Sequence, residues 1–185
     1  AWVIIIIGIV SVLYGAFVAL AQTNLKRMIA YTSVNHMGYT VLGLAVAGAL
    51  LSGDEAARQL ALVGATVEMV AHGLITGSLF LICGSFWQRT EDYELAHYGG
   101  LARRAPLLTG FTVLAAFASL GLPGLAGFVA EFHVFAGTFA VYPGLAVIGI
   151  FGILITTALF LQTLTQLFFG ELPPRLDGFS DLGRR

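Results

Sequence analysis

The stretch Leu122-Pro-Gly-Leu-Ala-Gly-Phe-Val-Ala-Glu-Phe-His-Val-Phe-Ala-Gly137 decides the fold of this chain. It is apolar except for Glu131 and His133, and it opens with a Leu122-Pro123-Gly124 break. A carboxylate inside hydrocarbon is expensive and is normally kept for function. A Pro-Gly break at membrane depth is tolerated only where protein or water surrounds it. The acid and the break together predict a membrane protein that moves ions.

The composition agrees with that prediction. Of 185 residues, 58% are hydrophobic and only 10% are charged, and the apolar runs exceed about 18 residues, the length typical of an all-α integral membrane protein. The first 21 residues lack the basic start and the cleavage site of a signal peptide. The single cysteine, Cys83, excludes an intrachain disulfide, and we interpret it as a thiol packed among helices. A formal net charge of −1 argues against a nucleic-acid partner.

Hydrophobic runs divide the chain into five predicted transmembrane spans, which form a helical bundle over residues 1–170. Residues 171–185 then leave the membrane as a cytoplasmic segment. The predicted spans are residues 2–21, 28–51, 61–86, 106–140 and 143–169.

The fourth span is predicted to be discontinuous at Leu122-Pro123-Gly124. As a straight helix it would measure roughly 51 Å, too long for a hydrocarbon core of about 30 Å but too short for two spans and a turn. With a single broken span, only Arg58 of the nine Lys and Arg residues lies on the outer side. Two crossings would reduce this asymmetry, so the positive-inside rule favours one. The predicted cytoplasmic side carries Lys26, Arg27, Arg89, Arg103, Arg104, Arg175, Arg184 and Arg185.

Two loops carry local signals. Residues 54–58 are an acidic helix start, with Ser52 as a candidate cap. The longest loop, residues 88–105, is either a solvated connection or a surface for neighbouring subunits.

Five ionisable side chains remain at membrane depth: His36, Glu68, His72, Glu131 and His133. Glu68 and His72 are four residues apart, so they share a helix face and could form a hydrogen-bonded pair. Such a pair suits either a proton relay or a structural bond between helices. Glu131 and His133 are two apart, and therefore point to different sides of a helix. We expect Glu131 to face the bundle interior and carry protons. His133, a further candidate for the relay, is expected to face a neighbour or the outer half of the bilayer.

His36 lies in a polar patch of the second span, where it could line water as a further proton-relay residue or bond across helices. Lys26 precedes it at the predicted interface, where snorkelling is the favoured interpretation. No metal-ligand cluster of standard spacing, phosphate-binding loop, dinucleotide motif or nucleophile elbow is found in the sequence.

Three ordered motifs carry a resemblance to a known family. They are Asn24-Leu-Lys-Arg-Met-Ile-Ala-Tyr-Thr-Ser-Val-Asn-His-Met-Gly38, then Met69-Val-Ala-His-Gly-Leu74 with Gly99-Gly-Leu101, then Leu120-Gly-Leu-Pro-Gly124 through Phe128-Val-Ala-Glu-Phe132. Over essentially the whole chain, this pattern resembles the antiporter-like membrane subunits of respiratory complex I. Within that family it is most similar to the subunit M branch of NADH:quinone oxidoreductase, the counterpart of mitochondrial subunit 4.

The resemblance implies that the chain is a fragment covering about helices 9 to 13 of a fourteen-helix antiporter-like fold. It implies that Glu131 is the terminal acid of a proton relay and that His72 is the histidine leading to it. The family's further relay lysines have no match here, so the chain alone is not expected to pump. It also implies a bacterial inner membrane, other complex I subunits as partners, and no cofactor bound by this chain. NADH, FMN, iron-sulfur clusters and quinone would be handled by other subunits.

Two other functions stay open. Glu68 stands where a glutamine-like residue is expected in the subunit M branch, which leaves the D subunit of Mrp-type sodium/proton antiporters as an alternative. A haem-binding membrane cytochrome could use His36, His72 or His133 as axial ligands. Sodium-dependent transport and a visible absorption spectrum would distinguish these functions from a proton-pumping subunit.

Overall fold

The computed structural model describes residues 2–49 and 54–183, and within these ranges it is helical, with one isolated β-bridge and no strand. The all-α prediction is therefore confirmed for the described chain. The helices are α1 (Trp2–Leu20), α2 (Leu25–Ala49), α3 (Glu55–Thr90), α4 (Leu101–Arg104), α5 (Pro106–Ser119), α6 (Ala126–Val141) and α7 (Pro143–Phe168), with 3-10 turns η1 (Leu95–His97) and η2 (Pro174–Leu176).

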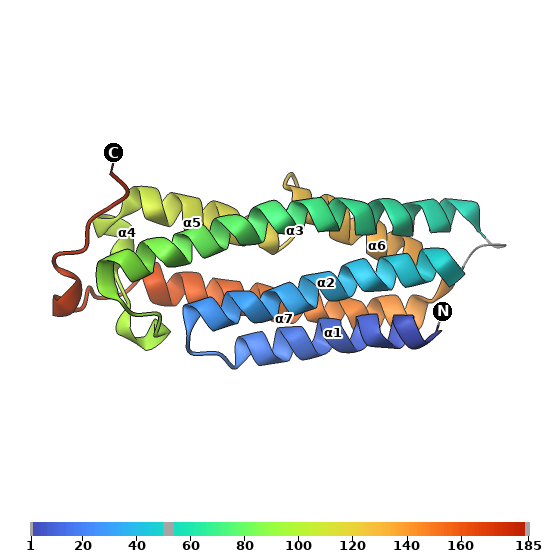
Figure 1. The fold of residues 1–185 in the computed structure, drawn as a ribbon, viewed down its shortest axis with the longest axis horizontal. Helices are drawn as coiled ribbons and strands as arrows, with labels where there is room; N and C mark the ends of the chain where they lie inside the picture. The colour runs from blue at the N-terminus through green and yellow to red at the C-terminus, as the bar shows by residue number, and fades with distance from the viewer. Residues whose placement is uncertain (1, 50–53, 184–185) are drawn as a thin grey trace.

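The long helices lie along one axis of an elongated bundle, and the chain begins near one end and finishes at the other (Figure 1). By length and composition, α1, α3 and α7 could each cross a membrane, and α5 and α6 are shorter apolar helices. Large apolar side chains cover the outside, among them Leu81, which is 77% exposed, and Val3, which is 71% exposed. Helices that are apolar on all sides are typical of membrane spans, so this is a multi-pass membrane protein.

The boundaries of α3 extend beyond the predicted span 61–86 at both ends. Asp54 caps its start, because the Asp54 carboxylate accepts hydrogen bonds from the N–H groups of Ala56 and Ala57 at 3.0 and 3.1 Å. The helix ends at Glu91, whose backbone adopts the left-handed conformation and whose N–H donates a hydrogen bond to the carbonyl of Trp87. Ser52 and the predicted end of the second span at residues 50–51 lie outside the described residues, as do residues 184–185 of the C-terminal segment.

Close helix packing sets the positions of α3 and α6. A Cβ atom on Gly137 of α6 would lie 2.6 Å from the backbone nitrogen of Ala61, and one on Gly64 of α3 would collide with the backbone nitrogen of Val134. Only glycine allows the two backbones to approach so closely, as is usual between membrane helices. This contact places the middle of α3 directly against α6.

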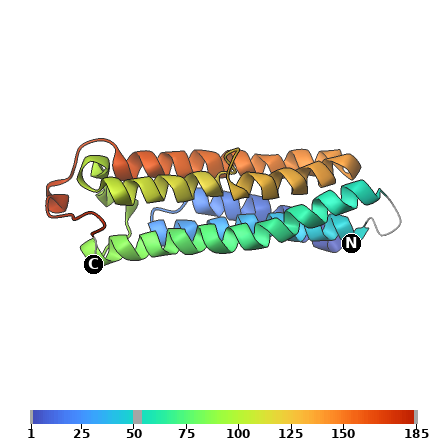
Figure 2. The same cartoon turned by 90° about the horizontal axis from the view of Figure 1, so that it is seen from above.

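Between α5 and α6 the helix is interrupted. Residues 120–125, which include Pro123 and Gly124, form turns in which Gly121 and Gly124 have φ angles of 69° and 100°. These left-handed conformations suit glycine, because it carries no Cβ. Viewed from above, α5 and α6 follow one another along the bundle on either side of this interruption (Figure 2).

The loop of residues 88–105 is not a simple solvated connection. It folds against residues 170–183, and we call the two segments together the end region. Leu95, Leu101 and Leu176 are buried there, and the ring of Phe179 packs 5.9 Å from that of Phe86. The sequence did not predict this contact, because the two segments lie far apart in the chain.

Asp92 joins the two halves of the end region. Its carboxylate accepts hydrogen bonds from the Glu94 N–H at 2.8 Å and from Arg175 at 2.9 Å, and lies 2.7 Å from Nδ1 of His97. Partial burial alone would raise the pKa of Asp92, but the bonds from Glu94, His97 and Arg175 outweigh it and lower that pKa from 3.8 to about 2.

We expect acid to loosen the end region. Because the pKa of Asp92 is lower in the folded chain than in the unfolded one, its contribution to stability is complete above about pH 4 and is lost as the pH falls toward about 2. Hydrogen exchange of residues 170–183, corrected for intrinsic rates, should accelerate over that range. An Asp92→Asn variant should already exchange faster at neutral pH. Full protection of these residues at pH 2 would contradict the assignment.

Candidate functional site

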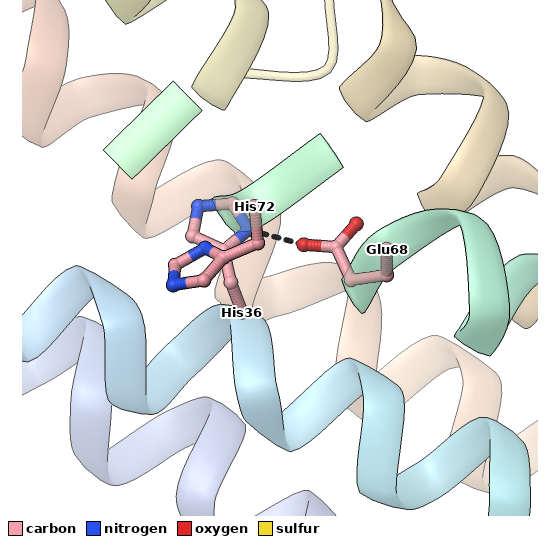
Figure 3. Close-up of side chains that lie close together, drawn as sticks. All are labelled: His36, Glu68 and His72. Atoms are coloured by element: carbon pink, nitrogen blue, oxygen red, sulfur yellow. Dashed lines mark ion pairs between the residues drawn. The ribbon is translucent and has the colours of Figure 1, made fainter. Parts of the chain in front are cut away.

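Three helices bring one imidazole and two carboxylates together inside the bundle. Nδ1 of His36, on α2, lies 3.2 Å from Oε1 of Glu68 on α3 and 3.7 Å from Oε1 of Glu131 on α6. All three residues are at most 5% exposed. Figure 3 shows the imidazole of His36 facing the carboxylate of Glu68. We call His36, Glu68 and Glu131 the central cluster.

The helix interruption makes room for the carboxylate of Glu131. A Cβ atom on Gly121 would collide with Oε2 of Glu131, so only glycine fits there. Glu131 lies near the beginning of α6, five residues after Ala126. The interruption thus holds a carboxylate at the centre of the bundle.

Ser119, the last residue of α5, completes the surroundings of His36. Its Oγ lies 3.0 Å from Nε2 of His36, on the side of the ring opposite the carboxylates. Ser119 is 3% exposed. Both ring nitrogens of His36 therefore have polar partners, as buried polar groups require.

His72 does not pair with Glu68 in the way that the four-residue spacing predicts. Nδ1 of His72 instead lies 3.1 Å from Oγ1 of Thr76, one turn further along α3, and its ring lies 5.4 Å from the ring of His36, tilted by 36°. Glu68 turns toward His36 because α2 packs against α3 at this level. The spacing correctly places both residues at one site, but the hydrogen bond goes to a different helix.

The remaining predicted residues lie away from the central cluster. His133 is partly exposed on α6, where its Nδ1 lies 2.6 Å from the carbonyl of Val129. Lys26 is exposed near the end region, with its ammonium 5.7 Å from the centre of the Tyr93 ring. Neither residue contacts His36 or either carboxylate of the cluster in the described structure.

Sequence reasoning missed Ser119 and Tyr39. Tyr39 is fully buried, and its ring packs against that of His36 at 5.8 Å. Its hydroxyl and one carboxylate oxygen of Glu68, Oε2, have no hydrogen-bond partner among the described residues. Tyr39 follows His36 by three residues and so shares its helix face, a signal that could have found it. Ser119 carries no comparable signal, since its partner lies 83 residues away.

One group within the described ranges has the residue types of a metal site. Ligand atoms of His36, Glu68 and His72 all lie within 4.8 Å of one another. Two imidazoles and a carboxylate are ligands that transition metals accept. In this arrangement Nδ1 of His36 lies 3.2 Å from Oε1 of Glu68, while Oε2 of Glu68 has no hydrogen-bond partner among the described residues.

Comparison with known proteins gives one family. The model described as "NADH:quinone oxidoreductase/Mrp antiporter, TM" matches residues 1–156. NADH-quinone oxidoreductase subunit M of Pseudomonas aeruginosa is 39% identical over 164 residues, and the protein of the same name from Escherichia coli K12 is 38% identical over 165. These matches cover 89% of this chain and 30% of each relative. The chain therefore spans less than a third of the length of these relatives.

Solved structures give the same fold. A chain of respiratory complex I from Thermus thermophilus with bound NADH superposes with a TM-score of 0.87 at 31% identity, over 98% of this chain and 36% of that one. A chain of the Mrp complex from Dietzia sp. superposes with a TM-score of 0.83 at 24% identity, over 94% of this chain and 31% of that one, which supports the fold alone. The antiporter-like membrane fold implied by the resemblance is confirmed.

Proposed function

The chain belongs to the transmembrane family of NADH:quinone oxidoreductase and Mrp antiporters, and on this basis we propose that it is part of a proton-translocating subunit of NADH:quinone oxidoreductase. The observation that carries the proposal is the central cluster, which joins an imidazole to two carboxylates at 3.2 and 3.7 Å inside an apolar bundle. Ionisable groups at membrane depth are costly and mark ion pathways. The subunit M relatives, at 38% and 39% identity, favour this branch of the family.

The charge balance of the cluster suits a relay. A buried cluster of two carboxyl groups and one imidazole is electrically neutral when it holds two protons, which avoids the cost of an unpaired buried charge. Two protons on three groups leave one group ready to accept another. A proton entering from one side can therefore displace one toward the other side by short steps through His36 Nδ1.

We assign the residues as follows. The proton passes directly from Glu68 through His36 to Glu131. Glu131, beside the helix interruption, is the last residue of this path and releases the proton on the outer side. His72 is half-buried and lies next to the ring of His36, so it supplies protons to the central cluster through His36. His133 and Lys26 are not part of this path.

The membrane arrangement belongs to the same proposal. The chain crosses five times, with α5 and α6 together forming one discontinuous crossing at Pro123 and Gly124. The end region is cytoplasmic, the membrane is a bacterial inner membrane, and the partners are the other membrane subunits of the complex. The subunit carries protons without a redox group of its own, coupled to quinone reduction elsewhere in the complex, where the redox cofactors are held.

The test uses inverted membrane vesicles that contain the complex with the full-length subunit. We expect NADH oxidation by quinone to acidify the vesicle interior, equally with and without sodium. Sodium/proton exchange without any NADH-driven acidification would overturn the proposal in favour of an Mrp-type antiporter. A Soret absorption band stoichiometric with the subunit would overturn it in favour of a cytochrome.

A further inference from the structure

The contact between Ser119 and His36 differs from those of three other buried hydroxyls in the bundle. Thr112, Thr138 and Thr156 each donate to a carbonyl four residues earlier in their own helix, at 2.6, 2.7 and 3.0 Å. This is the ordinary arrangement for a hydroxyl in an apolar helix. Ser119 instead reaches another helix, where its Oγ lies 3.0 Å from Nε2 of His36. A bond of this kind orders the ring of His36.

We propose that Ser119 is a positioning residue of the relay: its hydroxyl holds Nε2 of His36 in every protonation state of the ring, so that Nδ1 stays between Glu68 and Glu131. This inference rests on the proposed function, because it assigns Ser119 a task within that proton path. Ser119 exchanges no proton with the path itself.

The chemistry of a hydroxyl explains why serine fits here. After Glu131 has released a proton outward, His36 takes a proton from the Glu68 carboxyl group onto Nδ1. It becomes an imidazolium whose Nε2–H donates to Ser119 Oγ, and Glu68 becomes a carboxylate. When Nδ1 then gives that proton to the carboxylate of Glu131, the ring is neutral again. Throughout this transfer Nε2 keeps its hydrogen and Ser119 Oγ accepts from it. If the neutral ring instead carries its hydrogen on Nδ1, Ser119 donates its O–H to Nε2. A hydroxyl can reverse its role by rotating its hydrogen, whereas a carbonyl only accepts and an amide N–H only donates.

The position of Ser119 links His36 to the helix interruption. Ser119 ends α5, and Gly121, two residues later, packs against the carboxylate of Glu131. One short segment therefore touches both the imidazole and its outer proton partner. The other titratable groups that face His36 are Glu68 and His72 from α3 and Tyr39 from its own helix. Glu131 from α6 faces the Nδ1 side of the ring. Ser119 contacts the Nε2 side.

The experiment compares Ser119→Ala with Ser119→Thr in the full-length subunit within the assembled complex. Losing a hydrogen bond to a group that becomes charged should slow NADH-driven proton pumping about tenfold in Ser119→Ala. Ser119→Thr keeps the hydroxyl and should retain most of the rate. The matched control is Thr112→Val, which removes a buried hydroxyl from the same helix that bonds only to its own backbone, and it should pump normally.

A second measurement separates positioning from packing. If proton transfer at His36 has become limiting, the pumping rate of Ser119→Ala should fall more in heavy water than that of the wild type or of Thr112→Val. If Ser119→Ala does not assemble, Ser119→Cys replaces it, and because a thiol is a weak hydrogen-bond partner, we expect an intermediate rate with the same enlarged isotope effect.

The outcomes distinguish the inference from the function beneath it. Normal pumping in Ser119→Ala, or a Ser119→Thr variant as slow as Ser119→Ala, overturns the role of Ser119. If Glu131→Gln is defective in the same assay, the proton path itself still stands. Normal pumping in both Ser119→Ala and Glu131→Gln means instead that the proposed function has failed.

Discussion

Replacing Glu131 with glutamine is expected to reduce NADH-driven proton pumping to less than about a tenth of the wild-type rate while the complex still assembles. Glutamine fills nearly the same volume, so it should fit the space beside Gly121, but it cannot take up or release the proton. General acid–base groups typically contribute about 10²- to 10⁴-fold to the rates of the steps that they serve. Pumping is measured in inverted vesicles, with assembly followed by native electrophoresis.

Glu55→Gln provides the control for this substitution. Glu55 is an exposed carboxylate at the start of α3 that pairs with Arg58 at 2.9 Å, and its loss should leave pumping unchanged. Glu131→Asp should give an intermediate rate, because the shorter side chain lengthens a separation from His36 that is already 3.7 Å. A Glu131→Gln complex that pumps at the wild-type rate would remove Glu131 from the proton path.

The part of the fold set by hydrophobicity could be predicted from the sequence. Long apolar runs predict helices, and the Pro123-Gly124 dipeptide predicts the break between α5 and α6. The packing of the end region could not be predicted, because Asp92 and Arg175 meet only after the whole bundle has formed. Their charges look like those of any solvated loop when read one segment at a time.

The candidate site shows the same division. The acid in an apolar stretch identified Glu131, and helical spacing placed Glu68 and His72 together. Spacing along one helix does not reveal which partner a side chain takes when a second helix offers a closer one. Glu68 consequently bonds to His36, whose central position between two carboxylates depends on how α2, α3 and α6 pack. Ser119 gave no local signal, because a serine in an apolar helix usually bonds to its own backbone.

His36→Gln is expected to impair pumping as strongly as Glu131→Gln, because His36 is the residue that lies within 4 Å of both carboxylates. The amide keeps polar atoms in the site but cannot carry a proton between Glu68 and Glu131. His72→Ala should have a smaller effect, since His72 contacts the ring of His36 rather than the carboxylates. Rates of NADH oxidation with an uncoupler present will show whether the complex remains intact.

Combining His36→Gln with Glu68→Gln tests whether the two residues act in one path. Groups that act as a unit give strongly non-additive effects, so the double variant should pump no more slowly than His36→Gln alone. Glu68→Gln by itself should be milder, because His72 still offers the ring of His36 a neighbouring proton donor. If the two substitutions instead multiply in their effects on the pumping rate, Glu68 and His36 act independently of one another, and the contact at 3.2 Å between them is then structural.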